Sequence, residues 1–232
     1  MNKEKRASQF GRSMIEMLGV LAIIGVLSVG GISGYTEAMR KYKMTKTIEI
    51  FRASLFRLME LDQMKHGGKR EEIYGGVDQL VALGLFPEEI CDKNYVDING
   101  YTGWSCQLPV GEINMDFYLS GDYPLFGEYD ITFTDDDKVR NCVDFLSYHW
   151  EKITPKEWYN RFEWSSGTYS SGGFILVYSN SAGSKEIFAG NKEYAEQEHI
   201  PNELTMDNIA KACHDACEDE WCTVELSFRS QL

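Results

Sequence analysis

The chain has 232 residues, a formal net charge of −13 and a hydrophobic content of 43%, which fits one ordinary domain with an appendage. Its apolar and aromatic content excludes a disordered chain, and a mean hydropathy of −0.34 excludes a protein with many membrane spans. The acidic excess argues against a nucleic-acid-binding protein, which needs a clustered basic surface to neutralise phosphates.

The charge is distributed unevenly along the sequence. Residues 1–11 carry a net charge of +2, residues 12–36 are neutral overall, residues 37–70 carry +5, and the remainder carries −20. The sequence therefore predicts an acidic body that follows a basic stretch and an apolar N-terminal segment.

The N-terminal segment has 20 uncharged residues between Glu16 and Glu37, and most of them are apolar. As a helix that rises about 1.5 Å per residue, this run would cross a hydrocarbon core of roughly 30 Å. The sequence predicts one membrane-spanning helix, with a cleaved secretory signal peptide as the alternative. Glu16 at the front of the run, and the lack of an Ala-x-Ala-like cleavage site after it, argue against a signal peptide.

Residues 11–35, GRSMIEMLGVLAIIGVLSVGGISGY, resemble the class III signal of type IV prepilins and type II secretion pseudopilins. The resemblance implies that a prepilin peptidase cuts after Gly11 and methylates Arg12, the first mature residue, although this position is usually apolar in the family. It also implies that Glu16 pairs with the N-terminal amine of a neighbouring subunit, because a buried carboxylate and a buried ammonium are tolerable as a pair.

Many pilins have a helix-breaking proline midway through this segment, which this sequence lacks. Three glycines stand nearby instead: Gly30, Gly31 and Gly34. They weaken a helix relative to alanine, which would allow local melting in a filament. Alternatively, the Gly30-x-x-x-Gly34 spacing allows close helix packing.

The resemblance implies an α+β pilin fold, in which a long N-terminal helix packs on an antiparallel sheet. It divides the chain into a leader at 1–11, a transmembrane and assembly helix at 12–36, the amphipathic second half of the helix at 37–66, and a disulfide-containing head at 67–232. The implied function is that of a structural, non-enzymatic subunit of a type IV pilus or related filament.

Several partners and locations follow from the resemblance. The implied partners are prepilin peptidase, the inner-membrane assembly platform, membrane lipid before assembly, and other copies or other pilins in a helical filament; no cofactor and no nucleic acid are expected. Six cysteines after the span suit an oxidising exterior, so we expect the head outside the inner membrane, then in a surface pilus or periplasmic pseudopilus. The alternatives are a type II secretion pseudopilin, a minor tip pilin, or a membrane-anchored extracellular binding module or enzyme.

The remaining sequence contains recognisable secondary-structure patterns. Apolar residues at helical steps predict that the long helix continues to about His66 and packs Phe51, Leu55 and Leu58 on the head. A short helix is predicted over Tyr74–Pro87. Strands are predicted at Glu128–Thr134, at Phe174–Ser179 with KEIFAG as its hairpin partner, and at Cys222–Phe228, all of them half-buried.

Two segments, Thr134–Trp150 and Thr205–Trp221, share the pattern T-x-D-x5-C-x-D-x5-W. The pattern predicts two short helices, each capped by its threonine and each docking a cysteine and a tryptophan. Duplication and convergence both explain it.

The cysteines allow many pairings, which the sequence alone does not choose between: Cys91, Cys106, Cys142, Cys213, Cys217 and Cys222. A local Cys91–Cys106 bridge is expected. Cys213 and Cys217 lie one helical turn apart, which is poor geometry for a mutual bridge, so they are expected to reach Cys142, Cys222 or both.

Metal and catalytic sites are not predicted. Cys213, His214, Cys217 and Cys222 lack the ligand spacing of zinc modules. The run Asp135, Asp136 and Asp137 resembles calcium ligands but lacks the spacing of a calcium loop, and it suits a helix N-terminus. No nucleophile motif or phosphate-binding loop is present, so no catalytic residues are expected.

Overall fold

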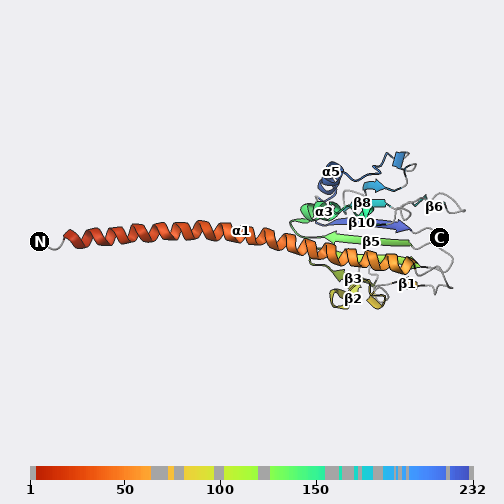
Figure 1. Cartoon of the computed structure of the whole chain (residues 1–232), viewed down its shortest axis with the longest axis horizontal. Coiled ribbons are helices and arrows are strands. Elements are labelled where there is room, and N and C mark those ends of the chain that lie inside the picture. The colour runs from red at the N-terminus through yellow and green to blue at the C-terminus, as the bar shows by residue number, and fades with distance from the viewer. Residues whose placement is uncertain are drawn as a thin grey trace. The chain divides into compact units, whose positions relative to one another are not determined.

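The protein is described from a computed structural model of the whole chain (Figure 1). The structure describes residues 4–63, 73–75, 81–96, 102–119, 126–154, 162–163, 170–171, 174–179, 185–190, 192, 195–196, 199–217 and 220–229. The chain forms two compact units, residues 1–43 and residues 44–232.

The first element is helix α1, which runs from Glu4 to Gln63. The first proline of the chain is Pro87, so no residue of this stretch breaks the backbone hydrogen-bond ladder. The prediction of one long helix is confirmed, but the helix begins at Glu4 rather than near residue 13. The residues EKRASQ at its start are mostly good helix formers, which explains the longer helix.

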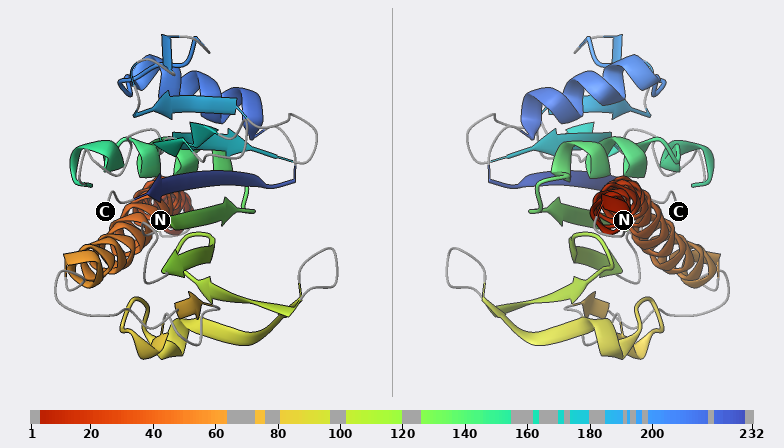
Figure 2. Two further views of the ribbon diagram at one scale, coloured as in Figure 1. Left: turned by 90° about the vertical axis from the view of Figure 1, so that its right-hand side faces the viewer. Right: turned by 90° about the vertical axis from the view of Figure 1, so that its left-hand side faces the viewer.

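Residues 44–232 contain an antiparallel sheet and several short helices, which confirms the α+β class. The strands are β1 (Ile73–Gly75), β2 (Cys91–Val96), β3 (Thr102–Gln107), β4 (Glu112–Leu119), β5 (Phe126–Phe133), β8 (Phe174–Tyr178), β9 (Lys185–Ala189) and β10 (Cys222–Arg229). Their order is β2-β3-β4-β5-β10-β8-β9, and β1 pairs with β4 (Figure 2). Strands β6 (Phe162–Glu163) and β7 (Ser170–Ser171) form a separate pair.

The short helices are α3 (Lys138–Leu146) and α5 (Met206–Ala216), together with the 3-10 helices η2 (Glu88–Ile90) and η3 (Trp150–Lys152). Phe145 of α3 contacts both Phe51 of α1 and Phe133 of β5, with ring centroids 5.3 and 6.2 Å apart. Helix α3 therefore covers the same face of the sheet as the second half of α1.

The second half of α1 buries one face on the sheet. Its buried side chains recur at helical steps: Met44, Thr47, Phe51, Ser54, Leu55 and Leu58. The Phe51 ring meets Tyr129 of β5 and Trp150 of η3 edge-on, with centroids 4.9 and 4.6 Å apart, an arrangement that aromatic rings prefer. The predicted stripe of Phe51, Leu55 and Leu58 is confirmed.

Two buried polar contacts fix the position of α1 along the sheet. Thr47 Oγ1 accepts a hydrogen bond of 2.9 Å from the backbone N–H of Val110. About two turns further along the same helix face, the Ser54 and Tyr129 hydroxyls lie 2.9 Å apart in a buried hydrogen bond. Burial raises the pKa of Tyr129 far above its ordinary value, and the hydrogen bond with Ser54 opposes this only in part. The tyrosine therefore stays neutral, as a buried hydroxyl must.

The predicted strands are confirmed as β5, β8 with its hairpin partner β9, and β10. Strand β10 departs from the half-buried pattern, because it lies between β5 and β8 and is buried on both faces. Its polar residues Thr223, Glu225 and Ser227 are only 3, 9 and 2% exposed. The Thr223 hydroxyl is satisfied by the Thr132 hydroxyl of β5 at 2.8 Å, which makes its burial tolerable.

The prediction of a helix over Tyr74–Pro87 is wrong at its start, where Ile73–Gly75 forms β1. Only Val81 and Ala82 are helical among the described residues of this stretch, and Gly84 ends the turn with a φ of 72°. In the structure, β1 forms backbone hydrogen bonds with β4 around Tyr118. A helical pattern in the local sequence does not show such a distant strand partner.

The two segments of the near-repeat both form helices, α3 and α5, but they begin differently. Thr205 caps α5 as predicted, in a capping box with Asn208. Thr134 does not cap α3, which begins at Lys138 with Asp137 as N-cap and no side-chain capping bond. Trp150 is fully buried as expected, whereas Trp221 is half-buried beside Tyr178.

We predict that Ser54→Ala lowers the free energy of unfolding by about 1–3 kcal/mol, because it removes the buried hydrogen bond between the Ser54 and Tyr129 hydroxyls. Tyr129→Phe should cost less, because a helical serine can donate to the carbonyl one turn earlier. Urea unfolding of the full-length chain in mild detergent, followed by near-ultraviolet circular dichroism, measures both variants and the double variant. Additive losses in the double variant would show that the two hydroxyls are not coupled.

We predict that Gly111→Ala destabilises the head more than Gly84→Ala does. Both glycines have positive φ, 81° and 72°, which costs an L-residue about 1–2 kcal/mol. Only at Gly111 would the added Cβ lie 2.8 Å from the Thr132 carbonyl oxygen, whereas at Gly84 it meets no atom within 4 Å. Equal unfolding midpoints for the two variants would contradict the close approach of the β3–β4 turn to β5.

Candidate functional site

The apolar N-terminal part of α1 is the candidate functional segment. Within residues 1–43, the large apolar side chains from Met14 to Ile32 are between 52 and 74% exposed. Among the described residues, α1 is the one helix long and apolar enough to cross a membrane. An apolar surface of this extent on a soluble monomer marks a site of contact with lipid or protein.

The segment contains one charged side chain, Glu16, between Met14 and Thr36. Glu16 lies in helical backbone and is exposed, as are the apolar residues around it. Gly11 and Arg12 also lie within the helical backbone of α1, and the Arg12 side chain is outside the described part. The structure thus places the predicted cleavage position and the predicted pairing residue on consecutive turns of one helix.

The polar groups of this segment are compatible with a hydrocarbon environment where they are described. The Thr36 hydroxyl donates to the Ile32 carbonyl oxygen at 3.0 Å, one turn earlier in the same helix. Such back-bonding satisfies a hydroxyl without water. The apolar run therefore ends on a threonine that needs no outside partner.

Gly30, Gly31 and Gly34 lie in unbroken helix, and a Cβ added at any of them would meet no atom of this chain within 4 Å. Packing within the chain therefore gives no reason for glycine at these positions. Both predicted uses, close packing and local melting, involve contacts outside this chain.

The basic residues that follow the apolar run are largely paired along the helix. Glu37 lies 3.3 Å from Arg40 and 3.5 Å from Lys41. In the second unit, Lys46 lies 2.6 Å from Glu49, and Arg57 lies 2.9 Å from Glu60. The exposed pairs among these add little stability, but all of them interrupt the basic face that nucleic acid would need.

Three disulfides link the six cysteines. Cys91 bonds to Cys106 as expected, and the bridge joins β2 to β3 at a directly paired position. Cys213 bonds to Cys142, and Cys217 bonds to Cys222, so the expectation that Cys213 and Cys217 reach these two residues is confirmed. The Cys142–Cys213 bridge ties α3 to α5, and the Cys217–Cys222 bridge ties the end of α5 to β10.

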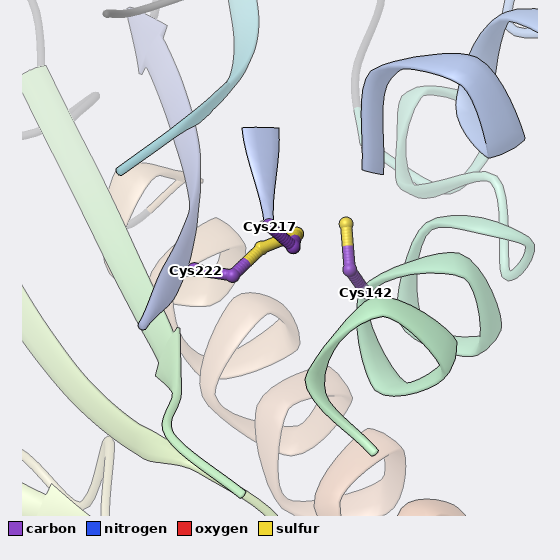
Figure 3. A group of neighbouring side chains, drawn as sticks. All are labelled: Cys142, Cys217 and Cys222. Carbon is purple, nitrogen blue, oxygen red and sulfur yellow. A yellow bond between two sulfur atoms is a disulfide. The ribbon is translucent and has the colours of Figure 1, made fainter. Parts of the chain in front are cut away.

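The sulfur atoms of Cys142, Cys217 and Cys222 lie within 4.8 Å of one another, and all three residues are buried (Figure 3). The two bridges therefore meet in one sulfur cluster, into which Cys142 points from α3 (Figure 3). His214 is exposed, and its Nδ1 lies 4.0 Å from the Asp215 Oδ1.

The run Asp135–Asp137 lies at the start of α3, as its composition indicates. Asp135 accepts two hydrogen bonds, of 2.9 and 3.1 Å, from the buried Asn141 amide, so this carboxylate acts on the protein itself. All three aspartates are exposed.

The structure also brings together three acidic residues of the sheet that the sequence does not predict as a group. Glu128 and Asp130 of β5 and Glu225 of β10 bring their carboxylate oxygens within 4.8 Å of one another, on the face of the sheet opposite to α1. Burial, then the negative charges of Asp130 and Glu225, raise the pKa of the nearby Tyr178 hydroxyl far above its ordinary value. In the sequence, the alternation in Glu128-Tyr129-Asp130 places the two acidic side chains on one face of the strand. The cross-strand register that pairs Asp130 with Glu225 cannot be predicted from that local pattern.

Comparison of the chain with models of protein families, with curated proteins and with solved structures found no match. The observed architecture, a long N-terminal apolar helix whose second half packs on an antiparallel sheet, is compatible with that of pilins.

Proposed function

We propose that the chain is a structural subunit of a type IV pilus or related filament, a pilin or pilin-like protein. The observation that carries the proposal is Glu16, the single charge at the front of an exposed apolar helix, five residues after Gly11. The resemblance of residues 11–35 to the prepilin signal gives both residues a role. The helix-on-sheet architecture of the head supports the same family.

The exposed apolar side chains of residues 14–32 require an environment other than water. Each large apolar side chain gains about 1.5–3 kcal/mol when it is buried. Before assembly the membrane provides that environment, with the segment as its single span. In the filament, the same surface packs against copies of itself or against other pilins.

The charge of Glu16 needs a partner in an apolar environment, and the filament can supply one. A carboxylate in the apolar region costs about 2.5–3.5 kcal/mol at mid-membrane on insertion scales and less near the surface. Cleavage after Gly11 creates an α-amine on Arg12, and this cation of one subunit can neutralise Glu16 of the next. Pairing of the two groups would set the register between successive subunits.

The disulfides support a head outside the cytoplasm, because three bridges in a chain of this size persist in an oxidising compartment. In this proposal the leader faces prepilin peptidase, and the mature chain passes to an inner-membrane assembly platform. A pseudopilin or a minor tip subunit would use the same helix in the same way.

We predict that the mature protein, isolated from membranes of cells that produce it naturally, begins at Arg12 and carries one methyl group on its α-amine. Intact mass spectrometry of the N-terminal peptide measures both changes. The Gly11→Leu variant should retain the leader, because the side chain before the cleaved bond is then too large for the peptidase. An intact Met1, or a cut at the end of the apolar run, would instead identify a membrane anchor or a signal peptide and refute the filament proposal.

We predict that Glu16→Ala is still cleaved but yields about tenfold fewer sheared filaments, which corresponds to about 1.4 kcal/mol of lost pairing per subunit. Glu37→Ala is the matched control, because Glu37 lies on the same helix after the apolar run and forms ion pairs with Arg40 and Lys41 of its own chain. Immunoblots of sheared and membrane fractions measure both variants. Normal filament yield from Glu16→Ala would remove the assigned role of Glu16.

A further inference from the structure

The sulfur cluster of the head brings two disulfides into mutual reach. The Cys142 sulfur belongs to the long-range bridge with Cys213, and it lies within 4.8 Å of both sulfurs of the Cys217–Cys222 bridge (Figure 3). Attack by a thiolate on a neighbouring disulfide is how bridges rearrange, and sulfur atoms this close need little movement for it.

The two bridges differ greatly in the length of the loop that they close. Cys217 and Cys222 are separated by 5 residues, whereas Cys142 and Cys213 are separated by 71. Closing a short loop costs less entropy than closing a long one, so Cys217 and Cys222 can pair before the head is folded. Cys142 and Cys213 meet only after α3 and α5 have docked.

Docking also removes Cys142 and Cys213 from outside reagents, because both are fully buried, 0% exposed. Exposing them again requires two helices to separate. Cys217 and Cys222 are also buried, 1 and 0% exposed, but only 5 residues separate them in the chain, so bringing them to a reagent does not require α3 and α5 to separate. The disulfide in reach of Cys142 in the docked head is therefore Cys217–Cys222.

We propose that the cluster is a disulfide relay, in which the local Cys217–Cys222 bridge forms first and is passed to Cys142–Cys213. The disulfide of an external dithiol oxidoreductase first oxidises Cys217 and Cys222, and the donor leaves as a dithiol. The Cys142 thiolate then attacks one sulfur of this bridge, and the other sulfur leaves as a thiolate.

The second exchange completes the transfer. The Cys213 thiolate attacks the Cys142 sulfur, the Cys142–Cys213 bond forms, and the sulfur that had been bonded to Cys142 leaves as a thiolate. A second donor disulfide then oxidises Cys217 and Cys222 again. Two donor disulfides are reduced and two protein disulfides form, so the electrons balance. The relay does not depend on the membrane or filament role of α1.

The relay is tested by removing the residue that completes it. In Cys213→Ser, the exchange stops at its intermediate, so Cys142 should be found bonded to Cys217 or Cys222 in a large fraction of folded molecules. The full-length variant in mild detergent is quenched with acid, alkylated and digested, and its bridges are mapped by mass spectrometry. A variant in which Cys142 is always the alkylated residue, with Cys217–Cys222 intact, would overturn the relay.

Cys222→Ser provides an independent test should the first variant fold poorly. Because thiol–disulfide exchange is reversible, its free Cys217 should exchange with the Cys142–Cys213 bridge, so that a fraction of folded molecules carries the relay intermediate Cys142–Cys217 with a free Cys213. The matched control is Cys91→Ser, which frees the equally buried Cys106 away from the cluster. Exchange of Cys106 with the cluster, or the same bridges in denaturant, would show general scrambling and would also overturn the proposal.

Discussion

The packing of residues 44–58 of α1 on the sheet holds the head together. Phe51 is the centre of this contact, because its ring meets rings from β5, α3 and η3. Thr47 and Ser54 add two buried hydrogen bonds to the β3–β4 turn and to Tyr129. Apolar packing is tolerant of small shifts, whereas buried hydroxyls lose their partners when the helix slides. The polar contacts therefore fix the register that the aromatic contacts stabilise.

The other half of the same helix has no such contacts among the described residues of its own unit. Residues 14–36 contain Glu16 as their single charge and expose nearly every apolar side chain. One helix thus carries two surfaces with opposite requirements, a head surface satisfied within the chain and an N-terminal surface that needs lipid or other subunits. The disulfides act on the head alone, where they tie α3, α5 and β10 into one unit.

The features that could be predicted from the sequence are those with local patterns. The periodicity of α1, the alternation in β5 and β10, and the Thr205 cap are all encoded within a few neighbouring residues. Strand β4 is not among the predicted strands, although Ile113, Met115 and Phe117 alternate along it. The cross-strand acidic group and the sulfur cluster depend on register and on helix docking, which no local pattern specifies. For the candidate site, the sequence alone supplied Gly11, Arg12 and Glu16, and the structure added their shared helix and its exposure.

Site-directed spin labelling along α1 tests most directly whether its N-terminal surface is built for hydrocarbon. The described cysteines are all in disulfides, so Leu27→Cys and Thr45→Cys can each be labelled singly in lipid vesicles that contain the full-length chain. We expect the label at position 27 to collide more often with oxygen, which concentrates in the bilayer, than with a water-soluble nickel complex. At position 45 the order should reverse. Equal or greater access of the nickel complex at position 27 would contradict a membrane-embedded helix.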